Sequence, residues 1–401
     1  MKQNIAVLFG GKSVEHEISV ISAVQAMAAM DTDSFELYPV YIAKDGGFWY
    51  GNALKDIALY KDIPALLKQC VLVELSARGG KVYLAPAEQR LLGKAKPIAL
   101  LDAALPIVHG TNVEDGALQG YLKTLGLPFA GCDVLASAVC MDKYVMKAML
   151  KAGGFPVLEG LRFQSAQGLE ADEIIARTEE RFAYPVIVKP VNLGSSVGIG
   201  KANDREELRD ALETAFSFAE TVLLEPCVQN LREINCAVLG DAQTAEPSEC
   251  EEPVVNTEDG LGLDYEKKYL AGEKGGKGSG MASLSRKIPA DISPELRKAI
   301  RDCAVGAFRY LDCCGVARID FLMDGKTGEF WLNELNTIPG SLAFYLWEPV
   351  GLPYGKLLEK LIYLAQKRSR RQRDIITSFD TNILEKQGGF GSKGAKGKLR
   401  G

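Results

Sequence analysis

The sequence has only two histidines among 401 residues, and its nine cysteines are scattered without a C-x-x-C pair. Zinc sites are built mainly from cysteine and histidine, so a zinc centre is not expected. An odd number of irregularly spaced cysteines also gives no disulfide framework. We therefore expect reduced thiols and a cytoplasmic location.

Long apolar runs and an excess of positive charge are also missing. No stretch approaches the ~20 apolar residues that span a bilayer, and the run Ile5–Phe9 is too short for a signal-peptide core. The net charge of −5 gives no reason to expect nucleic acid or an anionic membrane surface as a partner. With 47% apolar and 25% charged residues, the chain is typical of a globular protein, and its length allows roughly two to four domains.

The glycine loop Gly10–Ser13 does not match the known phosphate-binding motifs. It follows an apolar strand and precedes a predicted helix, as an anion-binding loop would. A P-loop needs a glycine where this chain has Ala6, and the fingerprint G-x-G-x-x-G is absent as well. The position of the loop therefore indicates a ligand site, whereas its spacing does not indicate a nucleotide.

Strand and helix patterns alternate in the first third of the chain. Strands are predicted at 4–10, 38–43 and 97–110, and helices at 14–30 and 114–126. This alternation predicts a doubly wound α/β sheet, in which ligands bind beyond the carboxyl ends of the strands. Gly10–Ser13 and His109–Gly116 both lie at predicted strand ends, so we expect the two loops to share a site. A satisfied structural histidine is the alternative interpretation of His109.

The pattern changes near Ala136. One amphipathic helix is predicted over 137–154, where two glycines end it. Further strands are predicted at 184–190, 197–202, 221–228, 232–241, 315–324 and 328–336, and helices at 204–219 and 353–368. The stretch 369–401 is rich in Lys, Arg and Gly and has no apolar periodicity, so a flexible basic tail is predicted.

Lys189 lies within a strongly apolar predicted strand, where a lysine must reach solvent or meet an anion. The loop after it contains glycines, which let the backbone approach a ligand, and the hydroxyls of Ser195 and Ser196. The combination predicts a lid that closes on phosphates. A hairpin tip with an edge-strand lysine explains this stretch equally well.

The last two predicted strands carry polar residues two positions apart. Arg318 and Asp320 share one face of their strand, and Glu334 and Asn336 share one face of theirs. The turn DGKTG predicts a hairpin, which would bring the two pairs together if the strands pair symmetrically. Two carboxylates and an amide are oxygen ligands that suit magnesium bound to phosphate. The alternative is a solvated face of a hairpin.

Other candidate residues carry little information individually. Glu225 ends a predicted buried strand before Pro226, where free backbone groups can bind an adenine edge, although glutamate is common at strand ends. Glu15 lies in the first turn of a helix, where the helix dipole favours a carboxylate in any case. Lys143 could be a surface helix lysine, and Lys268 and Tyr269 could belong to a disordered loop.

Seven motifs occur together along the chain: VLFGGKSVEHEIS, HGTNVEDGALQG, FAGCDVLASAVCMDK, YPVIVKPVNLGSSVG, DYEKKYL, ARIDF and NELNTIPG. In this order they resemble the D-alanine–D-alanine ligase family of the ATP-grasp superfamily, from Asn4 to Lys360. The resemblance implies an N-terminal doubly wound (pre-ATP-grasp) domain followed by an ATP-grasp fold of two α+β subdomains. The implied boundaries are 1–132, 133–223 and 224–366, with the basic tail at 367–401.

The resemblance also implies roles for the candidate residues. In this family the first glycine loop serves the amino-acid substrate, so Glu15 matches the residue that binds the ammonium group of the first D-alanine. Ser195 matches a residue that helps orient Glu15 and Tyr269, and His109 matches a histidine that lines the same pocket. Matches to ATP-binding residues are Lys143, Lys189, Ser196, Glu225, Pro226, Cys227, Val228, Glu233 and Lys268. Matches to metal ligands are Asp320, Glu334 and Asn336. Arg318 and the Gly340 backbone match the groups that stabilise the tetrahedral intermediate, and Ser341 and Leu342 match the residues that bind the second substrate.

The implied function is ATP-dependent formation of D-Ala-D-Ala through an acyl phosphate for peptidoglycan synthesis. ATP and Mg²⁺ or Mn²⁺, as two ions, are the implied cofactors, and a homodimer is implied. The segment SLAFYLWEPVG after Gly340 is shorter than the family pattern, which leaves the second substrate open. The alternatives are a ligase with another second substrate, such as D-serine, and a catalytically silent ATP-binding regulatory protein. AGEKGGKGSG contains no histidine, which disfavours a depsipeptide ligase.

Overall fold

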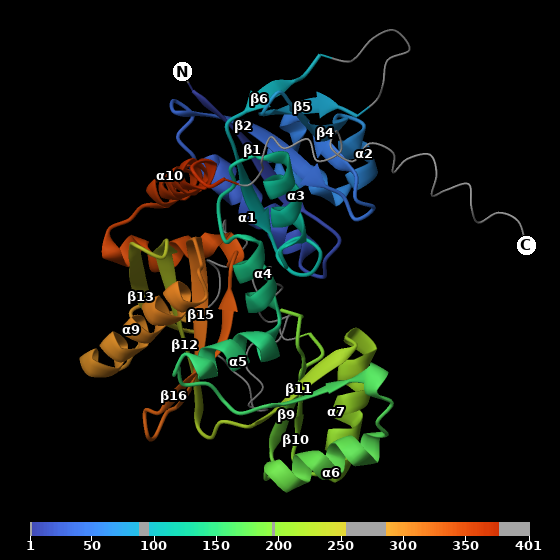
Figure 1. Ribbon diagram of the computed structural model, residues 1–401, viewed down its shortest axis with the longest axis vertical. Coiled ribbons are helices and arrows are strands. Elements are labelled where there is room, and N and C mark those ends of the chain that lie inside the picture. The colour runs from blue at the N-terminus through green and yellow to red at the C-terminus, as the bar shows by residue number, and fades with distance from the viewer. Residues whose placement is uncertain (1, 88–95, 195–196, 254–285, 377–401) are drawn as a thin grey trace, which may run out of the picture. The chain divides into compact units, whose positions relative to one another are not determined.

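The computed structural model describes residues 2–87, 96–194, 197–253 and 286–376, which form three β-sheets with helices packed against them (Figure 1). The α/β class predicted from the sequence is confirmed. None of the helices in these ranges combines enough length and apolar character to cross a membrane. All nine cysteines lie in the described ranges and are free thiols.

The first sheet has seven strands in the order β6-β5-β4-β3-β2-β1-β7. Their bounds are β1 Gln3–Gly10, β2 Phe35–Ile42, β3 Phe48–Tyr50, β4 Val71–Arg78, β5 Lys81–Pro86, β6 Ala99–Leu101 and β7 Ala103–Val108. Only the pairs that β1 makes with β2 and β7 are parallel, and the other pairs are antiparallel. The predicted strand 97–110 is therefore two strands, and the sequence patterns did not predict β3, β4 or β5.

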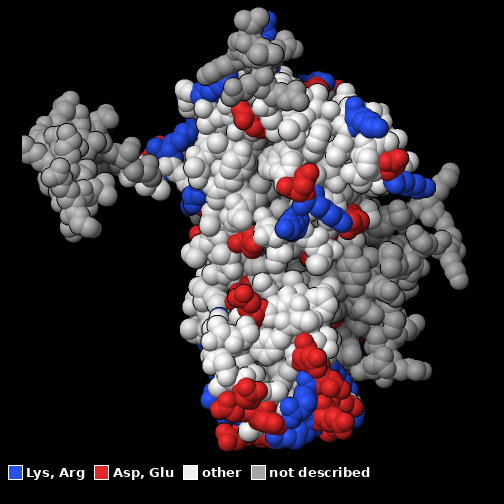
Figure 2. All heavy atoms as spheres, turned by 90° about the vertical axis from the view of Figure 1, so that its right-hand side faces the viewer, with Lys and Arg blue, Asp and Glu red and all other residues white. Residues whose placement is uncertain are grey.

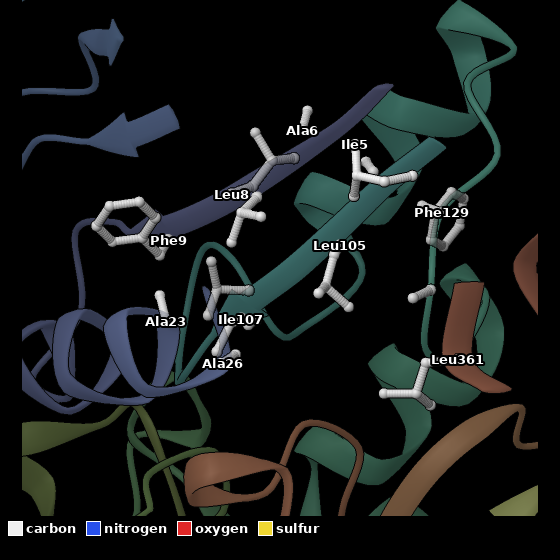
Figure 3. Packing of buried hydrophobic residues seen from close by; sticks show 14 of the residues in the cluster. Ile5, Ala6, Leu8, Phe9, Ala23, Ala26, Leu105, Ile107, Phe129 and Leu361 are labelled. Atoms are coloured by element: carbon white, nitrogen blue, oxygen red, sulfur yellow. The ribbon is translucent and has the colours of Figure 1, made fainter. Parts of the chain in front are cut away.

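Helices cover the parallel part of this sheet. Helix α1 (His16–Ala29) packs on β1 and β7, and α3 (Ala117–Leu125) follows β7. Figure 3 shows Phe9 of β1 and Ile107 of β7 on the side of the sheet that faces Ala23 and Ala26 of α1. The small alanines let the helix approach the sheet closely, and this packing fixes the loops at the ends of β1 and β7. Shorter elements of this region are η1 (Asn52–Lys55), η2 (Ile57–Lys61) and α2 (Ile63–Leu67).

The second sheet is antiparallel, with the order β10-β9-β11-β8. Its strands are β8 (Leu161–Gln164), β9 (Val186–Pro190), β10 (Gly200–Ala202) and β11 (Thr221–Pro226). The two strands predicted on both sides of the NLGSSVG loop are confirmed as β9 and β10, which pair with each other. Because β9 lies between β10 and β11, the alternative that Lys189 belongs to an edge strand is wrong. Helix α7 (Arg205–Phe218) packs on this sheet and α6 (Ala171–Arg181) packs on α7 (Figure 1); η3 (Ser165–Gln167) lies between β8 and α6 in the sequence.

The outer face of α6 and α7 carries charges of both signs, which Figure 2 shows mixed at the lower end of the view. Arg205 pairs with Asp172 and Glu179, and Arg209 pairs with Asp172. Exposed pairs of this kind contribute little to stability. This surface is therefore a solvated face of mixed charge.

The third sheet is antiparallel, with the order β14-β13-β12-β15-β16. Its strands are β12 (Leu231–Gly240), β13 (Ala245–Pro253), β14 (Arg286–Lys287), β15 (Gly315–Asp324) and β16 (Phe330–Asn336). Helix α9 (Pro294–Tyr310) packs on β12 and β13. The chain continues through η6 (Gly340–Leu346) and η7 (Glu348–Val350) into α10 (Tyr354–Arg373).

The prediction of one helix over 137–154 was wrong. Two helices, α4 (Val134–Met141) and α5 (Lys143–Ala152), are separated at Asp142, which has φ −92° and ψ 105°. The Asp142 carboxylate accepts hydrogen bonds from the N–H groups of Tyr144 and Val145 at 2.9 and 3.0 Å, as an N-cap residue does. Lys143 is therefore the first residue of a new helix. Both helices contribute to the hydrophobic core of the third sheet, and the domain boundaries stay a prediction.

Candidate active site

One cavity lies between the second and third sheets, with a volume of about 110 Å³. Its wall includes most of the residues that the sequence predicted for ATP, namely Lys143, Lys189, Glu225, Pro226, Cys227, Val228 and Glu233. Asp320 and Glu334, two of the predicted metal ligands, line the same cavity. The fold thus brings together residues that are up to 191 positions apart (Lys143 to Glu334).

The predicted hairpin brings the two polar pairs together as expected, although a register shift breaks its symmetry about the turn. Strands β15 and β16 pair with Arg318 opposite Asn336 and with Asp320 opposite Glu334. The Nε and Nη2 groups of Arg318 each donate to Asp320 at 2.6 Å, and Nδ2 of Asn336 donates to Asp320 at 3.1 Å. The Lys143 Nζ atom lies 3.1 Å from Oε2 of Glu334. Each carboxylate is thus held beside a cation.

These residue types could hold a hard divalent cation, although no group of three or more His, Cys, Asp or Glu residues in the described part of the chain is arranged to hold a metal. Two carboxylates and an amide on adjacent strands provide the oxygen donors that Mg²⁺ and Mn²⁺ prefer. The register shifts between Asp320 and Phe321, so Asn333 is an extra residue on β16. This β-bulge explains why the consecutive residues Asn333 and Glu334 both line the cavity, since adjacent side chains of a regular strand point to opposite faces.

Two buried lysines share Glu225. The Glu225 side chain on β11 contacts Nζ of Lys189, on β9, at 2.6 Å and also accepts a hydrogen bond from Nζ of Lys147, on α5. The sequence analysis did not identify Lys147 or Asn333. The position of Lys147, one helical turn after Lys143 on an amphipathic helix, was the available indication.

A smaller pocket adjoins the first cavity through Lys143, Leu193, Gly194 and Glu334. Glu15 and Glu114 line it, and Glu15 is 9% exposed. A Cβ atom on Gly194 would lie 2.9 Å from a carboxylate oxygen of Glu15, and one on Gly110 would lie 3.1 Å from it. Both backbones approach Glu15 as closely as only glycine allows. The two loops that were predicted to share a site contact each other, since Nδ2 of Asn112 donates to the carbonyl oxygen of Lys12 at 2.9 Å. Glu114 of the second loop lines the pocket, whereas Gly10–Ser13 does not.

Glu114 is a third residue that the sequence analysis missed. Its carboxylate accepts hydrogen bonds from Gly110 N–H at 3.0 Å, from Ile338 N–H at 2.9 Å and from the Thr337 hydroxyl at 3.2 Å. It thus ties the loop after β7 to the segment after β16. Burial raises the pKa of Glu114 from 4.5 to about 7, against the effect of these hydrogen bonds.

Both ring nitrogens of His109 have hydrogen-bond partners inside the protein. Its Nδ1 lies 2.8 Å from the carbonyl oxygen of Ile338, and a carbonyl only accepts, so Nδ1 carries the proton. Nε2 then accepts from the Ser22 hydroxyl at 3.2 Å. Burial lowers the pKa of His109, which keeps the ring neutral. These contacts agree with the structural interpretation of His109, and its role in the substrate pocket stays a prediction.

Ser341 and Leu342 are buried, with exposures of 1% and 2%. The Ser341 hydroxyl donates to Gln25 of α1 at 2.6 Å, and the Ser341 N–H donates to Ser22 at 2.9 Å. Ser341, Leu342 and Ala343 all adopt left-handed conformations, with φ of 51°, 54° and 51°. The turn directs the Ser341 hydroxyl to α1, so the structure adds no support to their predicted role in binding the second substrate.

Four predicted site residues, Ser195, Ser196, Lys268 and Tyr269, lie outside the described residues. Gly340 begins η6, directly after the segment that Glu114 and His109 hold in place. The roles assigned to all individual residues stay predictions.

Comparisons with known proteins match the same family over most of the chain. The family profile described as D-ala D-ala ligase N-terminus matches residues 4–132, and the one described as D-ala D-ala ligase C-terminus matches residues 149–363. The D-alanine–D-alanine ligase of Shouchella clausii is 39% identical over 391 residues, which cover 95% of this chain and 100% of that protein. The D-alanine–D-alanine ligase of Thermosipho melanesiensis is 36% identical over 383 residues, covering 95% and 98%.

Solved structures of ligases of this kind are also similar to the chain, and they confirm the predicted fold. The D-alanine-D-alanine ligase from Coxiella burnetii has a TM-score of 0.76 and 29% identity, with 93% of this chain and 96% of that chain covered. The VanG D-Ala:D-Ser ligase from Enterococcus faecalis has a TM-score of 0.73 and 29% identity, with coverages of 91% and 100%. Two matching profiles and relatives that match over nearly their whole length leave one assignment: the chain belongs to the D-alanine–D-alanine ligase family.

Proposed function

We propose that this protein is an ATP-dependent carboxylate–amine ligase that joins two D-alanine molecules for peptidoglycan synthesis. The observation that supports this most is the single cavity in which Lys143 and Lys189 lie beside the carboxylates Asp320 and Glu334. Cations for phosphates and oxygen ligands for a metal are both needed for phosphoryl transfer. A catalytically silent protein would have little reason to keep such a costly set of charges in one cleft.

Most of the predicted residues that the structure describes have a role in this proposal. Glu15 holds the ammonium group of the first D-alanine in the smaller pocket. Lys143 and Lys189 bind ATP phosphates, Glu225 to Val228 border the adenine, and Glu233 binds the ribose. Asp320, Glu334 and Asn336 would hold Mg²⁺ or Mn²⁺, as one or two ions. When bound, the metal would neutralise charge on the β- and γ-phosphates.

The chemistry follows from the weakness of a carboxylate as an electrophile. Its attack on the γ-phosphorus of ATP forms an acyl phosphate and releases ADP. The amine of the second amino acid then attacks the carbonyl carbon, the C–N bond forms, and phosphate leaves with the C–O bonding electrons. In this proposal, Arg318 and the Gly340 N–H stabilise the negative oxygen of the tetrahedral intermediate.

Phosphate release and product mass test the proposal directly. The purified protein would be given ATP, magnesium and D-alanine alone, and then D-alanine mixed with D-serine, D-lactate or L-alanine. We expect phosphate and D-Ala-D-Ala with D-alanine alone. Nucleotide binding without phosphate release under any condition would favour the regulatory alternative.

D-serine as the second substrate is the second candidate. The structural similarity to the VanG D-Ala:D-Ser ligase supports this candidate. Turnover only with the D-serine mixture would establish this alternative. We also propose a cytoplasmic homodimer, which light scattering of the purified protein would test.

A further inference from the structure

Two buried lysines depend on the same small set of acceptors. Glu225 is 1% exposed; its Oε2 lies 2.6 Å from Lys189 Nζ, and its Oε1 accepts a hydrogen bond from Lys147 Nζ. The side-chain oxygen of Asn333 lies 3.0 Å from Lys189 Nζ and 3.4 Å from Lys147 Nζ. One carboxylate and one amide oxygen are thus the shared acceptors of two ammonium groups.

The two lysines differ in their access to the nucleotide cavity. Lys189, Glu225 and Asn333 line that cavity, and among the described residues Lys147 does not belong to its wall. Lys147 instead lines a second cavity of about 210 Å³, which lies on the other side of Glu225 between α5 and β11. Lys189 can therefore turn to a nucleotide, whereas Lys147 stays behind Glu225.

This difference matters when Lys189 moves. A buried carboxylate that loses its partner is strongly destabilising. If Lys189 were the one cation beside Glu225, ATP could recruit it only by leaving Glu225 unpaired. Because Lys147 contacts the other oxygen, Glu225 stays paired when Lys189 leaves.

We propose that Lys147 is a positioning residue for nucleotide binding, which holds the charge of Glu225 so that Lys189 can move to the phosphates of ATP. This inference rests on the proposed function, since it needs Lys189 to bind ATP.

The electrostatics of the cluster agree with this role. Burial lowers the pKa of Lys147 to about 7, against the attraction of Glu225, and the charges of Lys189 and Lys143 lower it further. When Lys189 moves toward the phosphates, its repulsion of Lys147 weakens, and Lys147 binds its proton more tightly. ATP binding near pH 7 should therefore be coupled to proton uptake.

Steady-state kinetics of the full-length protein test the proposal. The variants are Lys147→Met, Lys147→Arg, Glu225→Gln and the double variant Lys147→Met/Glu225→Gln. Lys151→Met is the matched control, because Lys151 is an exposed lysine one turn further along α5. Phosphate release with D-alanine gives kcat and the KM for ATP, and thermal unfolding checks that each variant folds.

We expect Lys147→Met to raise the KM for ATP at least tenfold and to change kcat less than twofold. Lys147→Arg should restore the KM to within threefold of the wild type, and Lys151→Met should leave it unchanged. In the Glu225→Gln background, Lys147→Met should change the KM less than threefold, because no carboxylate remains to compete for Lys189. An equal rise in both backgrounds would overturn the proposal.

Calorimetry gives a second test that does not depend on the methionine variant. ATP binding at pH 7, measured in buffers of different ionisation enthalpy, reports proton uptake. We expect uptake by the wild type and its loss in Lys147→Arg, because arginine stays protonated. Identical uptake in both would overturn the inference while leaving the proposed function intact, whereas failure of the wild type to bind ATP would overturn both.

Discussion

At the residue scale, Glu15 owes its position to glycines on two neighbouring loops. Gly110 and Gly194 come from the loops after β7 and β9, and a Cβ on either would contact the Glu15 carboxylate. The sequence indicated that glycines let the backbone approach a ligand. It could not indicate that they make room for a carboxylate from α1, because that contact depends on how the sheets are placed.

Gly194→Ala tests this close approach. The new Cβ would lie 2.9 Å from a Glu15 oxygen, a distance that forces the carboxylate to move. We expect the KM for D-alanine to rise at least tenfold and the KM for ATP to stay within threefold. Gly120→Ala is the control, because its Cβ would meet no atom nearer than 3.9 Å. Equal KM values for D-alanine in the two variants would contradict this role for Glu15.

Glu114 gives a prediction about pH. Its pKa is 4.5 for an ordinary glutamate and about 7 here, so the folded state binds the proton more tightly than the unfolded chain. The contribution of Glu114 to stability is therefore greatest below pH 4.5 and is lost as the pH rises to 7 and above. We expect the free energy of unfolding of the wild type to fall between pH 5 and pH 8 relative to that of Glu114→Gln, as measured by urea denaturation. Parallel pH profiles would show that Glu114 has an ordinary pKa.

At the scale of elements, the sequence predicted the helices and strands whose apolar pattern and end signals lie together in a short stretch of the chain. The strands β1, β9 and β15 are apolar runs with clear ends, and the turn at 324–328 specified the last hairpin. The break between α4 and α5 was missed because apolar periodicity continues across Asp142, and only the side-chain cap marks it. The bulge at Asn333 was missed because a register shift depends on the partner strand.

Asp142→Ala tests whether this cap positions Lys143. Asp142 and Asp204 both cap helices by accepting two backbone N–H groups, so replacing either with alanine should cost about 1 kcal/mol of stability. Only Asp142 precedes a lysine of the nucleotide cavity. We expect both variants to lose similar thermal stability and only Asp142→Ala to raise the KM for ATP, by about threefold to tenfold. A similar rise in Asp204→Ala would show that the effect is global.

At the scale of the whole molecule, the site is a product of the fold. The sequence identified Lys143, Lys189 and Asp320 as separate candidates with plausible structural alternatives, and the resemblance to a family joined them. Their convergence in one cavity comes from two sheets and a helix that are distant in the chain. Lys147 and Glu114 were missed, because the contacts that show their roles are made with residues of other elements.

This convergence predicts that nucleotide and metal stabilise the protein together. A ligand that binds only the folded state at 100 times its Kd adds about 2.7 kcal/mol, which raises the Tm of a chain of this size by about 3 °C. Without a metal, Asp320 and Glu334 would face the triphosphate as like charges. We therefore expect thermal scans to show the full increase with ATP and magnesium, and less than half of it when EDTA removes the metal. Since Lys143 and Lys189 would still bind phosphate without the metal, an equal increase in both conditions would show that the carboxylates of β15 and β16 do not bind a metal with the nucleotide.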